Sequence, residues 1–397
     1  MRSSGNVPAK AVITAARRTA VVPRGGAFRL LQADELAAPV ITAVLADAGV
    51  RKEDVDHVIF GNALYGGGNP ARMAALRAGL PAHVPAMTID TQCCSGLDAI
   101  LLAVRMVEAG AADCIVAGGM ESFSRSPIRQ HRPVDKGGAA VPYDRPAFAP
   151  DPAMDPDLSE AAARLAERRG ISRETQADFA CLSHLKALDA YEAGAYAREL
   201  VTITAAPVPF DPFARRLTRS VAMRAPVLAG IADSGINAAT AAVEADAAAA
   251  VVVMSKDRAT GMARAGQRRA RVSVCAGVSV GDAPDEPALA PVAAIDSLLK
   301  QCGLAIADLA RIELMEAYAS QALATCDALD IPADVLNREG GALSRGHPIG
   351  ASGAVLAVRL FHGLTQETPS SRSALTGLAA IPAAGGLASA MALCFDD

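Results

Sequence analysis

Short apolar runs alternate with longer amphipathic segments over the first part of the chain, and the two kinds of segment differ in period. The apolar runs predict buried strands at 11–14, 55–60 and 114–117. The amphipathic segments have apolar residues at the spacing of one helix face and predict helices at 34–48, 71–78 and 97–108. Strands that alternate with helices favour a mostly parallel sheet covered by helices on both faces.

The segment 121–244 interrupts this alternation. It begins with a proline-rich stretch and continues with two helical patterns, 159–169 and 173–193, the second of which follows Ser172 in the N-cap position. We interpret 121–244 as an insertion that is not part of the sheet.

After the insertion the alternation resumes and repeats the order of the first part. The pair Ala38-Pro39 is matched by Ala290-Pro291, and Ser95-Gly96 at the start of one helix is matched by Ser352-Gly353 at the start of another. The repeat predicts two duplicated halves, an N-terminal half of 1–120 plus 245–268 and a C-terminal half of 269–397. A site between such halves receives a strand-end turn from each of them.

Composition narrows the class of protein. Of the 397 residues 51% are hydrophobic and only 4% aromatic, so small apolar side chains fill the interior, as in buried α/β layers. The net charge of −4 argues against a nucleic-acid partner. The eight cysteines form no CxxC pair and no Cys/His ligand spacing, so we expect neither a metal site nor a disulfide scaffold.

Membrane and export signals are also missing from the sequence pattern. Residues 1–10 have no apolar stretch of the kind that a signal peptide carries, and no run of 18 or more apolar residues occurs. We therefore expect a cytoplasmic protein that makes no contact with membranes.

Candidate chemistry begins in the turn 91–96, which carries Cys93 and Cys94 between a β-prone run and the helix 97–108. A cysteine at a strand-to-helix turn faces free backbone N–H groups and the helix dipole. Both effects lower the pKa of a thiol and favour a nucleophile. A buried structural cysteine is the alternative for any cysteine taken alone.

The equivalent turn of the second half carries a histidine. His347 lies in a glycine-rich stretch, 340–353, which the repeat places opposite the turn of Cys93. A cysteine that faces a histidine is the nucleophile-and-base arrangement of acyl transfer.

Five short motifs stand out along the chain: QCCSGL at 92–97, GGMES at 118–122, ISRETQADFA at 171–180, EAYASQ at 316–321 and GHPIGASG at 346–353. Together they resemble the motifs of the thiolase family, which contains acetyl-CoA acetyltransferases and 3-ketoacyl-CoA thiolases. The resemblance covers almost the whole chain. It implies an α/β fold with a duplicated five-layered α-β-α-β-α core, and it makes 121–244 a loop domain over the active site. It also implies coenzyme A thioesters as substrates, no permanently bound cofactor, and a homodimer or homotetramer.

The resemblance also implies roles for residues. Cys93 takes the acyl group from a thioester, and His347 activates Cys93 and helps to hold the thioester oxygen. The backbone N–H of Cys93 is a candidate donor of an oxyanion hole. In the family a second cysteine, in a CxG motif, moves a proton at the α-carbon, and an asparagine before the EAF motif positions a water.

Two of the positions that depart from the family pattern are catalytic positions in the family. Pro382 stands where the second cysteine belongs, and proline has neither a side-chain proton nor a backbone N–H. Met315 stands where the asparagine belongs. Both departures concern the carbon–carbon step, whereas acyl transfer onto Cys93 needs neither residue.

Further candidates follow with their alternatives. Cys94, Glu316 and Gly385 are candidate accessory residues. A structural role is the alternative for Cys94 and Glu316. His57 is a weaker candidate, because it lies in a predicted sheet strand. For coenzyme A the candidate contacts are Arg215, Arg216, Arg219, Met154 and Ala242, since guanidinium groups suit phosphates, with solvated surface as the alternative for the arginines.

Three functions remain open at this point. The first is a β-ketothiolase-like acyltransferase that acts on acyl-CoA through a Cys93 acyl-enzyme. The second is an enzyme of the same fold that passes the acyl group to another acceptor or hydrolyses it. The third is a weakly catalytic homologue kept for binding, which the intact pair of Cys93 and His347 disfavours.

Overall fold

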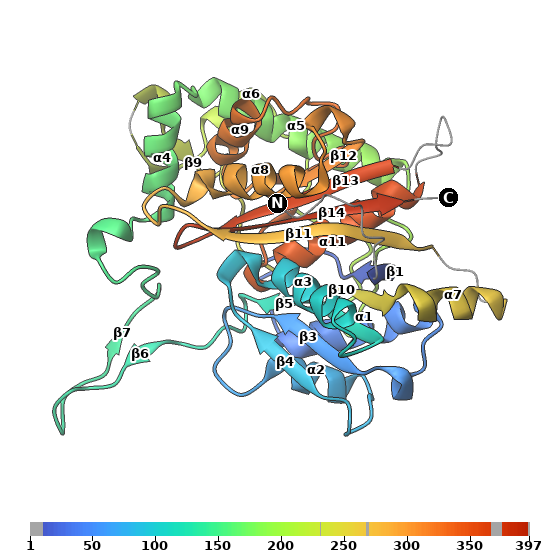
Figure 1. Cartoon of the computed structure of the whole chain (residues 1–397). Helices are drawn as coiled ribbons and strands as arrows, with labels where there is room; N and C mark the ends of the chain where they lie inside the picture. Colours follow the sequence, from blue (N-terminus) through green and yellow to red (C-terminus); the bar gives the residue numbers. More distant parts are fainter. Residues whose placement is uncertain (1–10, 231, 267–269, 367–374, 396–397) are drawn as a thin grey trace, which may run out of the picture.

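The computed structural model describes residues 11–230, 232–266, 270–366 and 375–395, and within these ranges ten strands form one mixed sheet. Its order is β12-β13-β14-β11-β1-β10-β5-β3-β4, with β2 beside β10 (Figure 1). The strands are β1 (Ala11–Arg18), β2 (Val22–Pro23), β3 (His57–Gly61), β4 (Ala86–Ile89), β5 (Cys114–Ser122), β10 (Ala245–Ser255), β11 (Val272–Gly281), β12 (Arg311–Leu314), β13 (Leu375–Ala383) and β14 (Leu387–Phe395).

The sheet divides into two halves, which are joined by the short β1–β11 pairing. Helices lie between these halves and on their outer faces. Helices α3 (Ser95–Glu108) and α11 (Ile349–Gln366) pack on each other between the halves. Helices α1 (Ala33–Ala48) and α2 (Pro70–Arg77) cover the outside of the N-terminal half, and α8 (Ala290–Cys302) and α9 (Ala319–Ala328) that of the C-terminal half. The α-β-α-β-α order confirms the expected fold class.

The expectation of a mostly parallel sheet is wrong. Only the pairs β3–β4, β3–β5 and β12–β13 are parallel among the described strands. The loop domain leaves from the end of β5 and returns at the same edge, so β10 runs antiparallel to β5. Strands β13 and β14 are antiparallel because a three-residue turn joins them, in which Gly385 and Gly386 have φ of 79° and 75°.

The two halves repeat one order of elements, as the duplication predicts. Each has an outer helix, a parallel strand pair, a central helix and a closing antiparallel strand, with α3 equivalent to α11 and β10 to β14. The boundary placed at 268/269 and the segment 1–10 lie outside the described residues. Helix α7 (Lys256–Arg264) precedes that boundary.

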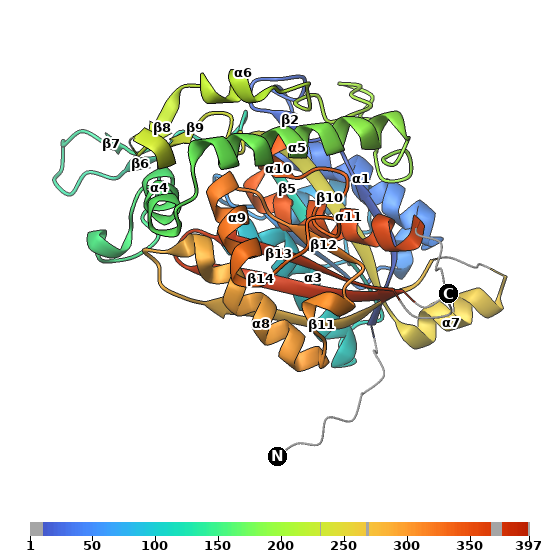
Figure 2. The same ribbon diagram turned by 90° about the horizontal axis from the view of Figure 1, so that it is seen from above.

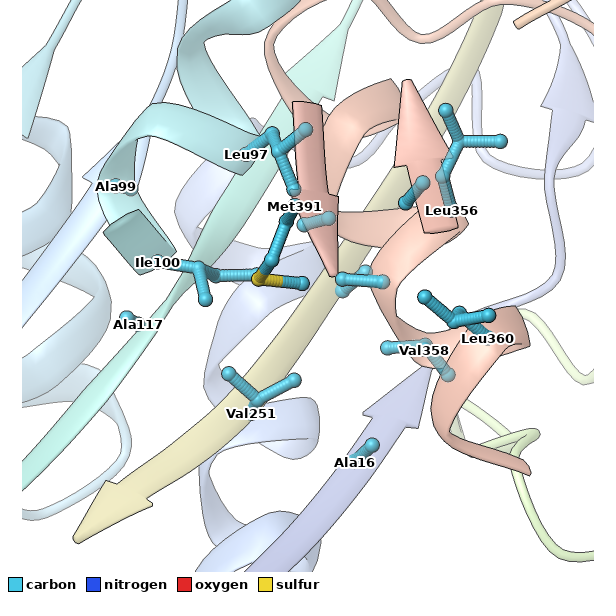
Figure 3. Packing of buried hydrophobic residues seen from close by; sticks show 14 of the residues in the cluster. Ala16, Leu97, Ala99, Ile100, Ala117, Val251, Leu356, Val358, Leu360 and Met391 are labelled. Carbon is cyan, nitrogen blue, oxygen red and sulfur yellow. The ribbon is translucent and has the colours of Figure 1, made fainter. Parts of the chain in front are cut away.

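Small residues bring the two central helices together. A Cβ atom on Gly96 would lie 2.8 Å from the backbone nitrogen of Ala354, and one on Gly353 would lie 2.6 Å from that of Leu97. Larger side chains fill the space beside this crossing, such as Leu97 and Met391 (Figure 3). Because α3 and α11 touch near their first turns, the turns that precede them are also neighbours.

The loop domain covers one side of the core (Figure 2). Its helices are α4 (Leu158–Arg169), α5 (Arg173–Glu192) and α6 (Arg219–Met223), of which α4 and α5 pack on α9. Strand pairs β6 (Gln130–His131)–β7 (Val141–Pro142) and β8 (Val227–Ala229)–β9 (Ile236–Asn237) complete it, the first of which extends away from the body. The helices at 159–169 and 173–193 are confirmed, and Ser172 Oγ caps the second by accepting from Thr175 N at 3.1 Å.

A buried ionic network ties the loop domain to both halves. Arg18 of β1 donates to Glu199 at 2.7 Å and to both oxygens of Asp211 at 2.8 and 2.9 Å. Arg359 of α11 pairs with Glu199 and donates to Glu339 at 2.7 Å. Burial raises the pKa of Glu199, but the charges of Arg359 and Arg18 outweigh burial and hold it at about 2.

We expect Glu199→Gln to lower the free energy of unfolding by about 3–5 kcal/mol, because it leaves buried guanidinium groups without their carboxylate. In the native protein this contribution is complete above the ordinary glutamate pKa of 4.5 and is lost as the pH falls towards about 2. Urea unfolding at pH 7 and acid unfolding of both proteins measure these effects. As a control, Glu286→Gln breaks a half-exposed pair with Arg168 and should cost at most about 1 kcal/mol.

Candidate active site

The turn that carries Cys93 is held by its own side chains. Cys93 lies in a 3-10 turn, η2 (Gln92–Cys94), at the start of α3, and Gln92 has a φ of 55°, which is strained for a residue with a side chain. Ser95 Oγ donates to Gln92 O at 2.6 Å and accepts from Thr91 N at 2.9 Å. Asp90 accepts from Gln92 N at 2.9 Å. The nucleophile candidate therefore stands on a strained, fixed turn.

His347 lies in the equivalent turn between α10 (Ala342–Arg345) and α11. Gly346 has a φ of 114°, a conformation that favours glycine. The next residue lies beside the C-terminal end of the loop domain, where His347 N donates to Val243 O at 2.7 Å. The ring then reaches Cys93 across the interface of the two halves. His347 Nε2 is 3.1 Å from Cys93 Sγ, and Nδ1 is 2.7 Å from Ser352 Oγ.

The hydrogen bonds of Ser352 determine which ring nitrogen of His347 carries the proton. Ser352 Oγ donates its one proton to Pro348 O at 3.0 Å, in the residue just before α11. It must then accept from His347 Nδ1–H, which leaves the lone pair on Nε2. The thiol of Cys93 donates to that lone pair, as a general base requires.

The electrostatics of the pair correct one expectation from the sequence. Burial raises the pKa of Cys93 to about 12, although the backbone N–H groups of Ala384 and Cys93 face the sulfur and lower it. Burial also lowers the pKa of His347 to about 4. The expectation of a lowered thiol pKa is wrong, because loss of hydration outweighs the N–H groups. The resting pair is a neutral thiol and a neutral imidazole.

The pair opens into a cavity of about 610 Å³ including its mouth, here called the Cys93 cavity. Small apolar side chains dominate its wall. The lining residues are Cys93, Leu158, Ala161, Ala162, Ala242, Pro287, Ala288, Ala317, Tyr318, Gln321, His347, Pro382, Ala383 and Ala384. Such a wall suits an acyl chain and the apolar part of a thioester.

The two substituted positions lie in different surroundings. Pro382 of β13 lines the Cys93 cavity and brings no proton to it. Met315 is 1% exposed, belongs to the central hydrophobic cluster and donates its backbone N–H to Ala380 O at 2.9 Å. Neither side chain provides a polar atom for a substrate or a water.

The candidate accessory residues stand outside the cavity lining. Cys94 is buried and directs its thiol to Ile381 O at 3.4 Å. Glu316 accepts from Asn337 Nδ2 at 2.6 Å and from Ser183 Oγ at 2.7 Å. Gly385 lies in the β13–β14 turn, and its neighbour Ala384 provides the N–H that faces Cys93. His57 is in β3, where Nδ1 contacts Val58 O at 3.2 Å.

Of the candidate coenzyme A contacts, only Ala242 lines the Cys93 cavity. Met154 ends a short turn, η3 (Pro152–Met154), of the loop domain. Arg219 pairs with Asp178, and the guanidinium carbon of Arg215 lies 4.3 Å from the ring centroid of Phe213. Arg215 and Arg216 line a separate depression beside α5. Their contact with coenzyme A stays a prediction.

Sequence reasoning missed two polar residues of the cavity. Tyr318 directs its hydroxyl to Ser159 Oγ at 3.1 Å, and Gln321 lies one turn further in α9. The end of the loop domain runs beside both α9 and His347, since Ala242 N donates to Ala317 O at 2.9 Å. The motif 316–321 could have indicated both residues. Tyr318 stands where the family motif has phenylalanine, and Gln321 follows one helical turn later.

Comparison with known proteins agrees with the fold. Residues 11–257 match the family model described as thiolase, N-terminal domain, and 266–394 match thiolase, C-terminal domain. The chain belongs to the thiolase family. It is an acyltransferase of the acetyl-CoA acetyltransferase and 3-ketoacyl-CoA thiolase type.

Particular relatives include the Bacillus subtilis protein named acetyl-CoA C-acetyltransferase YhfS, which is 36% identical over 97% of this chain and 99% of its own length. Among solved structures, the acetyl-CoA acetyltransferase of Bacillus anthracis has a TM-score of 0.87 and 29% identity, and covers 98% of this chain and 100% of its own. The human mitochondrial 3-ketoacyl-CoA thiolase in complex with CoA also has a TM-score of 0.87, with 27% identity and 98% of each chain covered.

No helix among the described residues is long and apolar enough to cross a membrane.

Proposed function

We propose that this chain transfers acyl groups from coenzyme A thioesters through a covalent thioester on Cys93, with His347 as the base. The observation that supports it best is the 3.1 Å approach of His347 Nε2 to Cys93 Sγ, with Ser352 holding the required tautomer. The CoA complex of the human relative supports coenzyme A thioesters as the substrate class. We also propose that the protein is cytoplasmic and that it forms a homodimer or a homotetramer.

The first half-reaction follows from the neutral pair. The thiol proton moves to His347 Nε2 as the sulfur attacks the carbonyl carbon, and the developing oxyanion is received by the N–H groups of Cys93 and Ala384. The bond from carbon to the coenzyme A sulfur then breaks. The departing thiolate takes the proton back from His347. An acceptor repeats these steps in reverse on the Cys93 thioester.

A second candidate function follows from Pro382. Its place on the cavity wall leaves the carbon–carbon step without the proton carrier of the family, and Met315 supplies no polar atom. The acyl group would then pass from Cys93 to a different acceptor, or to water. The pair of Cys93 and His347 disfavours a purely binding homologue.

Incubation with a series of acyl-CoA thioesters of increasing chain length tests the proposal. Intact-protein mass spectrometry should show one added acyl group per chain together with one equivalent of released coenzyme A. The preferred chain length reports the acyl substrate. Absence of an adduct with every thioester, while the protein remains folded, would contradict the proposal.

Restoring the proton carrier should raise carbon–carbon activity. We expect Pro382→Cys combined with Met315→Asn to increase cleavage of acetoacetyl-CoA by up to about 10²–10⁴-fold, the range for one acid–base group. Pro382→Ala combined with Met315→Asn is the matched control, since it removes the ring and adds no titratable group. If the native protein already cleaves acetoacetyl-CoA as fast as it acylates Cys93, another residue carries the proton.

A further inference from the structure

A carboxylate behind the turn of Cys93 joins three segments of the chain. Asp98 lies in the first turn of α3. Its Oδ2 accepts from Thr91 Oγ1 at 2.6 Å, and its Oδ1 accepts from Ser279 Oγ of β11 and Ser389 Oγ of β14, both at 2.6 Å. A carboxylate can only accept, so each hydroxyl gives its one proton to Asp98. O–H···O⁻ bonds of about 2.5–2.7 Å are charge-assisted and roughly twice as strong as bonds between neutral groups.

Two of these hydrogen bonds connect the two halves of the protein close to the reacting sulfur. Thr91 stands two residues before Cys93. Ser389 lies in β14, in the hairpin whose turn carries Ala384. The carboxylate of Asp98 therefore links the segment that bears the Cys93 N–H to the hairpin that bears the Ala384 N–H.

The two N–H groups that face the sulfur of Cys93 come from different halves. One belongs to Cys93 itself, at the start of α3, and the other to Ala384, in the β13–β14 turn. Donors of an oxyanion hole act only when each lies about 2.7–3.1 Å from the oxygen that becomes charged. A misplacement of about 1 Å can cost about 10²-fold in rate. The relative position of the two segments therefore has to be fixed close to the sulfur.

We propose that Asp98 is a positioning residue of acyl transfer, which holds these two N–H groups at the separation that the developing oxyanion needs. The inference deepens the proposed function and rests on it, because it assumes that Cys93 attacks a thioester carbonyl. Asp98 lies outside the lining of the Cys93 cavity. We therefore expect it to act on the rate of acylation and not on the binding of the thioester.

Two reactions of Cys93 separate this role from a structural one. Acylation by acetyl-CoA, or by the longer acyl-CoA that the native protein prefers, forms an oxyanion. Alkylation by iodoacetamide displaces iodide and forms none, although it uses the same thiol and the same base. We expect Asp98→Ala to slow the maximal rate of acylation at least about tenfold, towards the cost of about 10²–10³-fold for one lost donor. The rate of alkylation, and the thioester concentration that gives half the maximal rate of acylation, should stay close to native. Stopped-flow acylation and intact-protein mass spectrometry measure the two reactions.

Three further variants distinguish position from charge. Asp98→Asn keeps an oxygen for the two serines and offers an amide N–H to Thr91 Oγ1, since a hydroxyl also accepts, so it should recover most of the acylation rate. Ser389→Ala breaks the link to β14 and should slow acylation but not alkylation. Ser279→Ala is the matched control. It removes the other hydroxyl from the same oxygen, leaves the link between Thr91 and Ser389 in place, and should acylate at close to the native rate.

Three results would overturn the inference. They are native acylation in both Asp98→Ala and Ser389→Ala, an equal loss of acylation and alkylation, which would make Asp98 a structural residue, and an Asp98→Asn variant as slow as Asp98→Ala. Ser389→Ala, which removes a single hydroxyl, carries the test if Asp98→Ala does not fold. Each of these results leaves the proposed function standing. Failure of the unsubstituted chain to be acylated, with Cys93 still open to alkylation, would instead contradict the proposed function and the inference with it.

Discussion

Replacing Cys93 by alanine should reduce acyl transfer from coenzyme A thioesters by about 10⁴-fold or more, because the covalent route is lost with the nucleophile. The side chain is small and the cavity is open there, so we expect the fold and the melting temperature to change little. Release of free coenzyme A thiol, followed continuously, measures the effect.

Cys94→Ala is the matched control for this loss. Its thiol is adjacent in sequence but faces Ile381 O rather than the cavity. The variant should retain acyl transfer within a few-fold of the native rate. Loss of activity in Cys94→Ala with normal activity in Cys93→Ala would show that Cys94, and not Cys93, is the nucleophile.

Replacing His347 by alanine should slow acylation of Cys93 by about 10²–10⁴-fold at neutral pH, since no other base contacts the thiol among the described residues. The pH dependence should change as well. In the native protein the pair is neutral between the pKa of His347, about 4, and that of Cys93, about 12. Acylation should therefore be level from pH 6 to 8 and fall as acid protonates His347.

Acylation of the His347→Ala variant should instead become faster as the pH rises. Without the imidazole only the thiolate form of Cys93 reacts, and its fraction rises about tenfold per pH unit below the thiol pKa. Stopped-flow acylation of both proteins from pH 5 to 9 compares the two profiles. A native profile that falls with a midpoint near 6.5, the ordinary histidine pKa, would show that the resting pair is not the neutral one described here.

The sequence alone predicted the meeting of Cys93 and His347, for a local reason. Each residue precedes a helix with a Ser-Gly pair near its start, and the duplicated order of elements places these helices side by side. Gly96 and Gly353 approach a neighbouring backbone so closely that a side chain does not fit, and this requirement for glycine can be recognised in the sequence.

Other properties of the site depend on long-range packing that a local pattern does not record. Strand direction follows from where the loop domain returns to the sheet. The raised pKa of Cys93 reflects enclosure by residues from both halves and the loop domain, against which the local turn has little influence. The place of Gln321 in the cavity wall could not be predicted either, because its motif does not say which side chains of α9 line a cavity.

The most direct test of the account asks where the acyl group resides during turnover. The native protein is mixed with an acyl-CoA, quenched within one turnover and digested, and the peptide that carries the acyl mass is identified; a parallel sample receives free coenzyme A before the quench. The account predicts acylation of Cys93 that disappears on addition of coenzyme A at least as fast as steady-state turnover. Acylation of another residue, or a Cys93 adduct that discharges more slowly than turnover, would contradict it.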